Sequence, residues 1–249
     1  MSPPVLVRSP ALEENLHAPV VGEGFLHTSP EFALKRVLAS GLCRIYAVSP
    51  CFREEEWGPL HTREFTMVEW YRVGAGYLEL MEDVEDLLRY CAKQMGVPLP
   101  GFERHRYADL FERFTGSPAP IDAVERQRVW INEIENQLQS PTFVYDYPAD
   151  EAAFSEIRGS VAERFELFFQ GVELANAFSE LRDPEELRQR WDQNNTARVN
   201  HGRAPHPVDE RLIEAVGTHP RAAGIALGFD RLLYVLCNLS DIRQGQIPG

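Results

Sequence analysis

Two strand-like runs joined by a two-residue turn constrain the fold of this chain most. Arg164 to Phe169 and Val172 to Ala177 are rich in aromatic and β-branched residues, and Gln170-Gly171 between them is typical of a tight hairpin turn. Further strands are predicted over Arg44 to Ser49, Phe52 to Glu56, Glu64 to Val73 and Thr142 to Tyr147. Strands that follow one another through short turns favour an antiparallel β-sheet with helices packed around it. We therefore predict an α+β fold and not a Rossmann sheet.

Capping residues and apolar periodicity predict the helices. Ser29-Pro30-Glu31 is typical of a helix start, with Ser29 as N-cap, and Gly41 ends that helix. A second helix is predicted from Tyr77 to Cys91, because its apolar residues recur at helical spacing. A third begins at Asp183 and ends before Gly202, and a short fourth covers Val208 to Val216.

The composition limits the possible partners and locations. The chain has 249 residues, and its 38 acidic against 25 basic side chains give a net charge of −13. This charge argues against a broad basic face for nucleic acid. The length and a hydrophobic fraction of 44% suit one globular domain over residues 1–249. No stretch is typical of a membrane span or a signal peptide, so we expect a cytoplasmic protein. The four cysteines form no CxxC pair, and we interpret them as reduced thiols in the core.

The stretch from Cys51 to Tyr71 is the first candidate site. If Phe52 to Glu56 and Glu64 to Val73 form a hairpin, alternation places Arg53 and Glu55 on one face of the first arm. On the second arm it places four residues on one face: Phe65, Met67, Glu69 and Tyr71. A charged face flanked by aromatic rings favours a ligand with cationic and anionic parts. The alternative is a solvated face with cross-strand ion pairs.

The second candidate stretch runs from Gly224 to Leu236. Alternation separates a face of small residues, Gly224, Ala226 and Gly228, from a bulky face of Ile225, Leu227 and Phe229. The small face leaves room for a ligand. Arg231 follows in the first turn of a predicted helix, where the helix dipole disfavours a cation unless an anion such as a polyphosphate is bound. The alternative is close helix-on-sheet packing with Arg231 paired to an acidic residue.

The third candidate stretch contains Glu173, Asn176 and Glu180 within an apolar, strand-like run. Such side chains need a cation or a hydrogen-bonding partner there, and Mg²⁺ or a substrate ammonium would serve. The alternative is a strand end with solvated acids. The histidines show no metal-ligand spacing, and no GxSxG, Walker A or GxGxxG motif occurs.

Together these stretches resemble the catalytic domain of class II aminoacyl-tRNA synthetases. Phe52-Arg-Glu-Glu55 with His61 and Phe65 is similar to motif 2, and Gly224 to Leu232 is similar to motif 3. The resemblance is to the lysyl branch, and within it to the lysyl-tRNA synthetase paralogues that modify elongation factor P with (R)-β-lysine. It is carried by Thr28 to Glu31, Glu64 to Tyr71, and Glu173 to Asn176 with Glu180.

The resemblance implies an enzyme, an ATP-dependent amino-acid ligase. It would use ATP and Mg²⁺ to activate (R)-β-lysine or lysine as an aminoacyl-adenylate and transfer it to a lysine side chain of elongation factor P. Arg53 and Arg231 would be catalytic, on the α- and γ-phosphates respectively, and Glu173 would hold Mg²⁺. The implied ATP-binding residues are Arg53, Glu55, His61, Thr62, Phe65, Glu173, Leu174, Gly228 and Arg231. The implied residues for the amino acid are Ser29, Glu31, Glu69, Tyr71, Asn176, Glu180 and Ala226.

Departures from the family leave alternatives open. Ala226 is typical of the β-lysine ligases, where the synthetases have glycine, whereas Ala177 is typical of the synthetases. Compared with true synthetases, we expect no anticodon-binding OB domain and little of motif 1, whose long helix builds the homodimer that the family implies. tRNA is accordingly not the expected partner. The alternatives are adenylation for another acceptor, a tRNA or a carrier protein, and a truncated non-catalytic paralogue.

Overall fold

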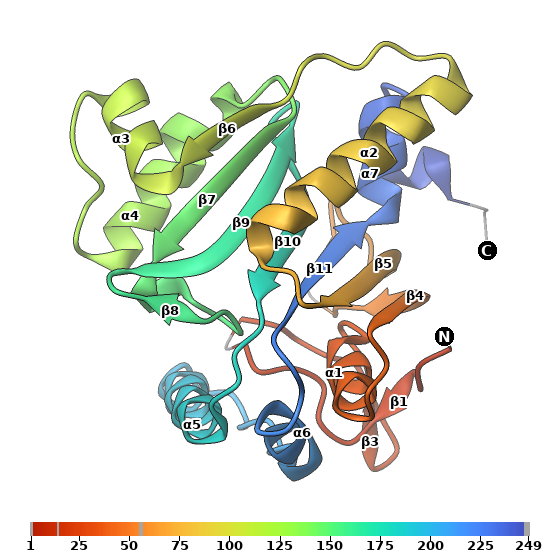
Figure 1. Ribbon diagram of the computed structural model, residues 1–249, viewed down its shortest axis with the longest axis vertical. Coiled ribbons are helices and arrows are strands. Elements are labelled where there is room, and N and C mark those ends of the chain that lie inside the picture. The colour runs from red at the N-terminus through yellow and green to blue at the C-terminus, as the bar shows by residue number, and fades with distance from the viewer. Residues whose placement is uncertain (1, 14, 55–56, 247–249) are drawn as a thin grey trace.

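The computed structural model describes residues 2–13, 15–54 and 57–246 and centres on a mixed β-sheet (Figure 1). Within these ranges eight strands form the sheet, in the order β4-β5-β11-β10-β9-β7-β6 with β8 paired to β9. Their bounds are β4 Arg44–Phe52, β5 Glu64–Val73, β6 Glu103–Arg106, β7 Thr142–Pro148, β8 Ile157–Arg158, β9 Val161–Phe169, β10 Val172–Ser179 and β11 Ala222–Gly228. Every pair is antiparallel except β6 with β7, which is parallel. The predicted α+β class is confirmed.

The predicted hairpin around Gln170-Gly171 is present as β9 and β10. Gln170 and Gly171 between them both have positive φ, 55° and 70°. Positive φ at both central residues is what a type I′ hairpin turn requires. Phe169 and Val172 pair directly across the turn. The two residues therefore fix the register of the strands that follow.

One strand prediction is wrong at its boundaries. The runs Arg44 to Ser49 and Phe52 to Glu56 are not two strands, because β4 continues through Pro50 and ends at Phe52. Proline lacks an N–H and is tolerated mainly in edge strands, and β4 is the edge strand of the sheet. Arg53 consequently follows a strand and does not lie within one.

The predicted helices are all present, with shifted ends. They are α1 Glu31–Ala39, α2 Tyr77–Met95, α5 Pro184–Asn200 and α6 Glu210–Val216, and α7 Phe229–Leu236 follows β11. Ser29 is not the N-cap of α1: the cap position is Pro30, and the Ser29 hydroxyl accepts a hydrogen bond from the Glu31 N–H at 3.0 Å. Asp183 caps α5 as predicted.

Helices cover the sheet unequally, and this leaves the site open. On one face α2 and α7 pack against Phe165, Leu167 and Ile225, among others (Figure 1). On the opposite face α1 covers β4 and β5 at one side. Helices α3 Tyr107–Thr115 and α4 Ala123–Val129, with a π-helical turn at 130–134, lie toward β7 and β9. The middle strands, β10 and β11, remain accessible between these two groups.

Three smaller features complete the fold. Strands β1 Leu6–Val7, β2 Val20–Val21 and β3 Gly24–Leu26 form a small antiparallel sheet beside α1 (Figure 1). Of the cysteines expected in the core, only Cys51 is buried; Cys91 is half-buried, and Cys43 and Cys237 are exposed. Among the helices of the described chain, none has the length and apolar character of a membrane span.

Candidate active site

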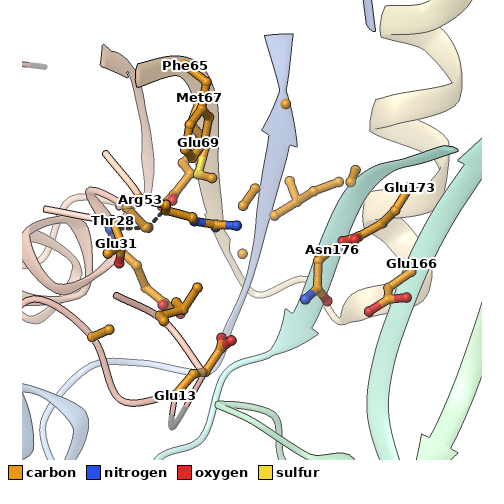
Figure 2. A pocket seen from close by; sticks show the side chains of 18 of the residues that line it. Glu13, Thr28, Glu31, Arg53, Phe65, Met67, Glu69, Glu166, Glu173 and Asn176 are labelled. Atoms are coloured by element: carbon orange, nitrogen blue, oxygen red, sulfur yellow. Dashed lines mark hydrogen bonds between the residues drawn. The ribbon is translucent and has the colours of Figure 1, made fainter. Parts of the chain in front are cut away.

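A cavity of about 390 Å³ lies on the open face of the sheet, over β5, β10 and β11. Figure 2 shows Glu13 and Arg53 entering it from the N-terminal half and Glu166, Glu173 and Asn176 from the opposite side. A cavity of this size suits a small-molecule ligand. Fifteen of the residues predicted for the site line it: Ser29, Glu31, Arg53, His61, Thr62, Phe65, Glu69, Tyr71, Glu173, Leu174, Asn176, Glu180, Ala226, Gly228 and Arg231. Glu55, predicted to bind adenine, lies outside the described residues.

Strand register brings the polar floor of this cavity together. Ala226 on β11 lies directly opposite Asn176 on β10 and opposite Glu69 on β5. Asn176 in turn lies opposite Glu166 on β9. Because residues directly opposite each other share a face of a sheet, these four side chains form a row across four strands. The predicted alternation of small and bulky residues on β11 is confirmed, except that Phe229 begins α7 and is 39% exposed.

A β-bulge explains how Glu173 reaches the same face as Asn176. Regular alternation would place residues three apart on opposite faces. The register of β10 against β9 shifts between Glu173 and Ala175, so one extra residue is inserted there. A bulge of this kind redirects the side chains on one side of it. Glu173 and Asn176 therefore both line the cavity.

Glu69 is the most deeply buried carboxylate of the cavity, with an exposed fraction of 1%. The Ser29 hydroxyl donates a hydrogen bond to its Oε1, and the Tyr71 hydroxyl donates to Oε2 at 3.3 Å. Burial, followed by the negative charge of Glu31, raises the pKa of Glu69 to about 8. A cationic partner would lower this raised pKa, because it stabilises the charged form of the carboxyl.

A second buried carboxylate, Glu180, lines the same cavity and has an exposed fraction of 2%. Burial raises its pKa to about 7, although the ammonium of Lys35 opposes the rise. Gly224 on β11 makes room for the side chains of Glu180 and Tyr71, because a Cβ on it would lie 2.4 Å from Glu180 Oε1 and 2.3 Å from Tyr71 Cε1. This end of the cavity is thus shaped to receive a cation.

Arginines gather at the other end of the cavity. The Arg53 guanidinium lies over the ring of Phe65, 5.1 Å from its centroid. Arg231 Nη2 donates to His61 Nε2 at 2.8 Å, and Nη1 donates to the Glu173 carbonyl at 3.0 Å. Arg231 Nη1 also lies 3.6 Å from the Glu173 carboxylate. Arg231 is therefore paired with an acidic residue, as the alternative interpretation of this stretch expected. Both arginines nevertheless line the cavity, as a site for a polyanion requires.

The start of α7 is held in place by Asp230. Its Oδ2 accepts the Thr66 N–H of β5 at 2.6 Å, and its Oδ1 accepts from Gln246 Nε2 at 3.1 Å. These contacts tie the first turn of α7 to the neighbouring strand. Arg231, the next residue, therefore projects from a fixed backbone, where the positive end of the helix dipole adds to its own charge.

Arg164 organises the side of the cavity formed by β9 and β10. Its guanidinium donates to the Asn176 Oδ1 at 3.1 Å and pairs with the Glu166 carboxylate. The Tyr147 hydroxyl donates to Glu166 Oε2 at 2.7 Å. Burial raises the pKa of Glu166 to about 7, and the charge of Glu173 adds to the rise. Because Arg164 holds the amide oxygen, the amide nitrogen of Asn176 is the end left for a ligand.

Sequence reasoning missed three residues that line the cavity, Glu13, Arg164 and Glu166, and also Lys35, which pairs with the lining residues Glu31 and Glu180. The alternation of Arg164 and Glu166 within a predicted strand was a usable signal, since it places both on one face. Lys35 carried a weaker signal, a lysine between Leu34 and Leu38 on an apolar helix side. Glu13 lies in a segment without periodicity, and nothing local indicated it.

Comparisons with known proteins show the family of this chain. The family model described as tRNA synthetases class II (D, K and N) matches residues 1–247. The elongation factor P–(R)-β-lysine ligase of Vibrio vulnificus is 39% identical over 248 residues, which cover 87% of this chain and 75% of that protein. The ligase of the same name from Proteus mirabilis is 37% identical over 243 residues, 88% of this chain and 75% of that protein. The chain therefore belongs to the class II tRNA synthetase family, in the branch of the elongation factor P–(R)-β-lysine ligases.

Proposed function

We propose that the protein activates (R)-β-lysine, or lysine, with ATP and transfers it to a lysine side chain of elongation factor P. The observation that carries this proposal is the polarity of a single cavity. Carboxylates of Glu31, Glu69 and Glu180 line one end, and guanidinium groups of Arg53 and Arg231 line the other. A diamino acid has two ammonium groups for the acidic end, and ATP has phosphates for the arginines. The names of the relatives supply the acceptor.

In the first step, a carboxylate oxygen of the amino acid attacks the α-phosphorus of ATP, and the bond to pyrophosphate breaks. The product is an aminoacyl-adenylate. Arg53 supports this step by holding the amino-acid carboxylate beside the α-phosphate, and Phe65 supplies a flat surface for adenine. Arg231 neutralises the phosphates that leave. The chain thus contributes orientation and charge stabilisation, which are its main means of lowering the barrier.

In the second step, a neutral lysine amine of the acceptor attacks the carbonyl carbon of the adenylate. The C–O bond to AMP breaks, an amide forms, and the amine loses a proton. Asn176 is placed to donate its amide N–H to the amino-acid carboxyl group, because Arg164 holds its oxygen. That contact keeps the carbonyl carbon in one position during both steps.

The carboxylates of Glu173 and Glu166 fit a Mg²⁺ ion. They line the same side of the cavity, and the charge of Glu173 helps to raise the pKa of Glu166; Mg²⁺ prefers oxygen ligands from one or two carboxylates plus substrate phosphates. Among the described residues no cluster of three or more His, Cys, Asp or Glu side chains forms a metal site of its own. When bound, Mg²⁺ would neutralise phosphate charge.

The test is exchange of labelled pyrophosphate into ATP, followed by mass measurement of the acceptor. We expect exchange with β-lysine or lysine, and faster exchange with β-lysine. Addition of elongation factor P should then raise its mass by one aminoacyl group. No exchange with any diamino acid would refute the proposal, and exchange without modification of elongation factor P would point to a different acceptor.

A further inference from the structure

Lys35 on α1 is a buried lysine in a chain whose basic residues are almost all arginines. The sequence contains only two lysines, Lys35 and Lys93, and its other 23 basic residues are arginines. Lys93 is exposed near the end of α2. The side chain of Lys35, in contrast, is 1% exposed. Burying an ammonium is costly unless it is paired. The groups paired with Lys35 therefore indicate its role.

Two carboxylates compensate the charge of Lys35. Its Nζ lies 2.7 Å from Glu31 Oε1 and 2.8 Å from Glu180 Oε2. The ring of Phe154 lies below the same ammonium, with its centroid 3.8 Å away. A compact ammonium fits between these groups, whereas the larger planar guanidinium of arginine has a different shape and donor geometry.

Lys35 lies behind the two carboxylates as seen from the cavity. Glu31 and Glu180 line the cavity, and Lys35 does not. The ion pair engages Oε2 of Glu180, while Oε1 lies next to Gly224 and accepts no hydrogen bond within the described residues. A buried acceptor of this kind is costly to leave unpaired. Glu180 therefore has one oxygen on an internal cation and one available to a second cation.

We propose that Lys35 is a positioning residue that sets the charge and direction of the ammonium-binding carboxylates without touching the substrate. This inference rests on the proposed function of the cavity. With Glu31, Glu69 and Glu180 ionised, the ammonium of Lys35 compensates one of three negative charges. The two that remain match the two ammonium groups of a diamino acid. Lys35 thus selects for the number of charges on the substrate.

The pH dependence follows from the groups around Glu180. They are Lys35 and Glu31 from α1, Tyr71 from β5 with Glu69 hydrogen-bonded to it, Glu156 before β8, and His219 before β11. Lys35 lowers the pKa of Glu180 against the effect of burial. Without the ammonium, Glu180 retains its proton to higher pH, and a protonated carboxyl binds the substrate ammonium poorly.

The first experiment compares Lys35→Met with the matched control Lys93→Met. KM for β-lysine or lysine is measured by pyrophosphate exchange between pH 6.5 and 9, together with thermal unfolding. At pH 7 we expect Lys35→Met to raise KM by about tenfold or more, with a smaller difference from wild type as pH rises. Lys93→Met should match wild type throughout. An increase in KM that is equal at every pH, or no increase, would overturn the inference.

A second experiment needs neither a stable variant nor catalysis. Wild-type protein labelled with ¹⁵Nζ-lysine has two side-chain ammonium signals, and unlabelled lysine is titrated in without ATP. We expect the Lys35 signal to exchange slowly with water and to shift on saturation, while the Lys93 signal stays in place. A Lys35 signal that is unchanged while lysine binds refutes the positioning role. If wild type neither binds nor gives exchange with lysine, and the same holds for β-lysine, the proposed function is refuted instead.

Discussion

Gly224 is the position where adding a single methyl group should disturb the site most. An alanine Cβ there would lie 2.3 Å from Tyr71 Cε1, 2.5 Å from Tyr71 Cδ1 and 2.4 Å from Glu180 Oε1. Favourable contacts between carbon atoms begin at about 3.5 Å, so Gly224→Ala requires a displacement of more than about 1 Å. The φ of Gly224 is not in the left-handed region, and the conflict is therefore steric and not conformational.

The surroundings of Gly224 leave little room for this displacement. Tyr71 is 3% exposed and packs against α1, and Glu180 is held by Lys35. Overpacking of this kind costs about 1–3 kcal/mol, which at this chain length lowers Tm by about 2–12 °C. A misplaced Glu180 loses a charge-assisted hydrogen bond to the substrate, and KM for the diamino acid should rise about tenfold or more.

Thermal unfolding and pyrophosphate exchange measure the two effects. Gly101→Ala is the matched control, because a Cβ at exposed Gly101 meets nothing within 4 Å. We expect the control to keep the wild-type Tm and KM. If Gly224→Ala also kept both, the close packing of Tyr71 and Glu180 over β11 would not contribute to substrate binding, and the argument for this end of the cavity would fail.

Three further outcomes test other parts of the site. Arg231→Ala should reduce exchange by about 10²–10³-fold with little change in Tm, and near wild-type exchange would exclude the assigned phosphate contact. Ala226→Gly should shift the ratio of kcat/KM from β-lysine toward lysine by about 1–3 kcal/mol; an unchanged ratio would remove Ala226 from substrate choice. The raised pKa values of Glu69, about 8, and Glu180, about 7, mean that the folded protein binds more protons than the unfolded chain. Stability of the ligand-free protein should therefore fall as pH rises from about 5 to 8, and saturating lysine should reduce that fall; a Tm independent of pH would contradict the burial argument.

Local patterns predicted the middle of the sheet well. The range Glu64 to Val73 agrees with β5, because polar and apolar residues alternate and turn residues precede the strand. The Gln170-Gly171 turn was also legible, since few residue pairs accept positive φ at both positions. The predicted strand break at Pro50 was wrong. A strand tolerates this proline because β4 is an edge strand, and its edge position is a property of the whole sheet.

The sequence predicted the candidate site best where a single strand supplies several of its residues. Alternation alone placed Phe65, Glu69 and Tyr71 on a common face, and all three line the cavity. Lys35 and Glu13 come from other segments, and only tertiary contacts bring them to the carboxylates and arginines. The helices α3 and α4 were not predicted, although α3 packs against β7 and β9 beside the site. Long-range packing, not local propensity, decides such positions.

The β-bulge in β10 has a consequence for how this cavity can change over evolution or by design. Glu173 precedes the bulge and Asn176 follows it, and both line the cavity; in the proposed function Glu173 faces the phosphates and Asn176 faces the amino acid. Deleting Leu174 would leave Glu173 two residues before Asn176, so regular alternation without a bulge would still place both side chains on the cavity face. Loss of the bulge residue would therefore shift the Glu173 side of β10 without turning either side chain away from the cavity, so the proposed nucleotide half and the proposed amino-acid half can be altered separately.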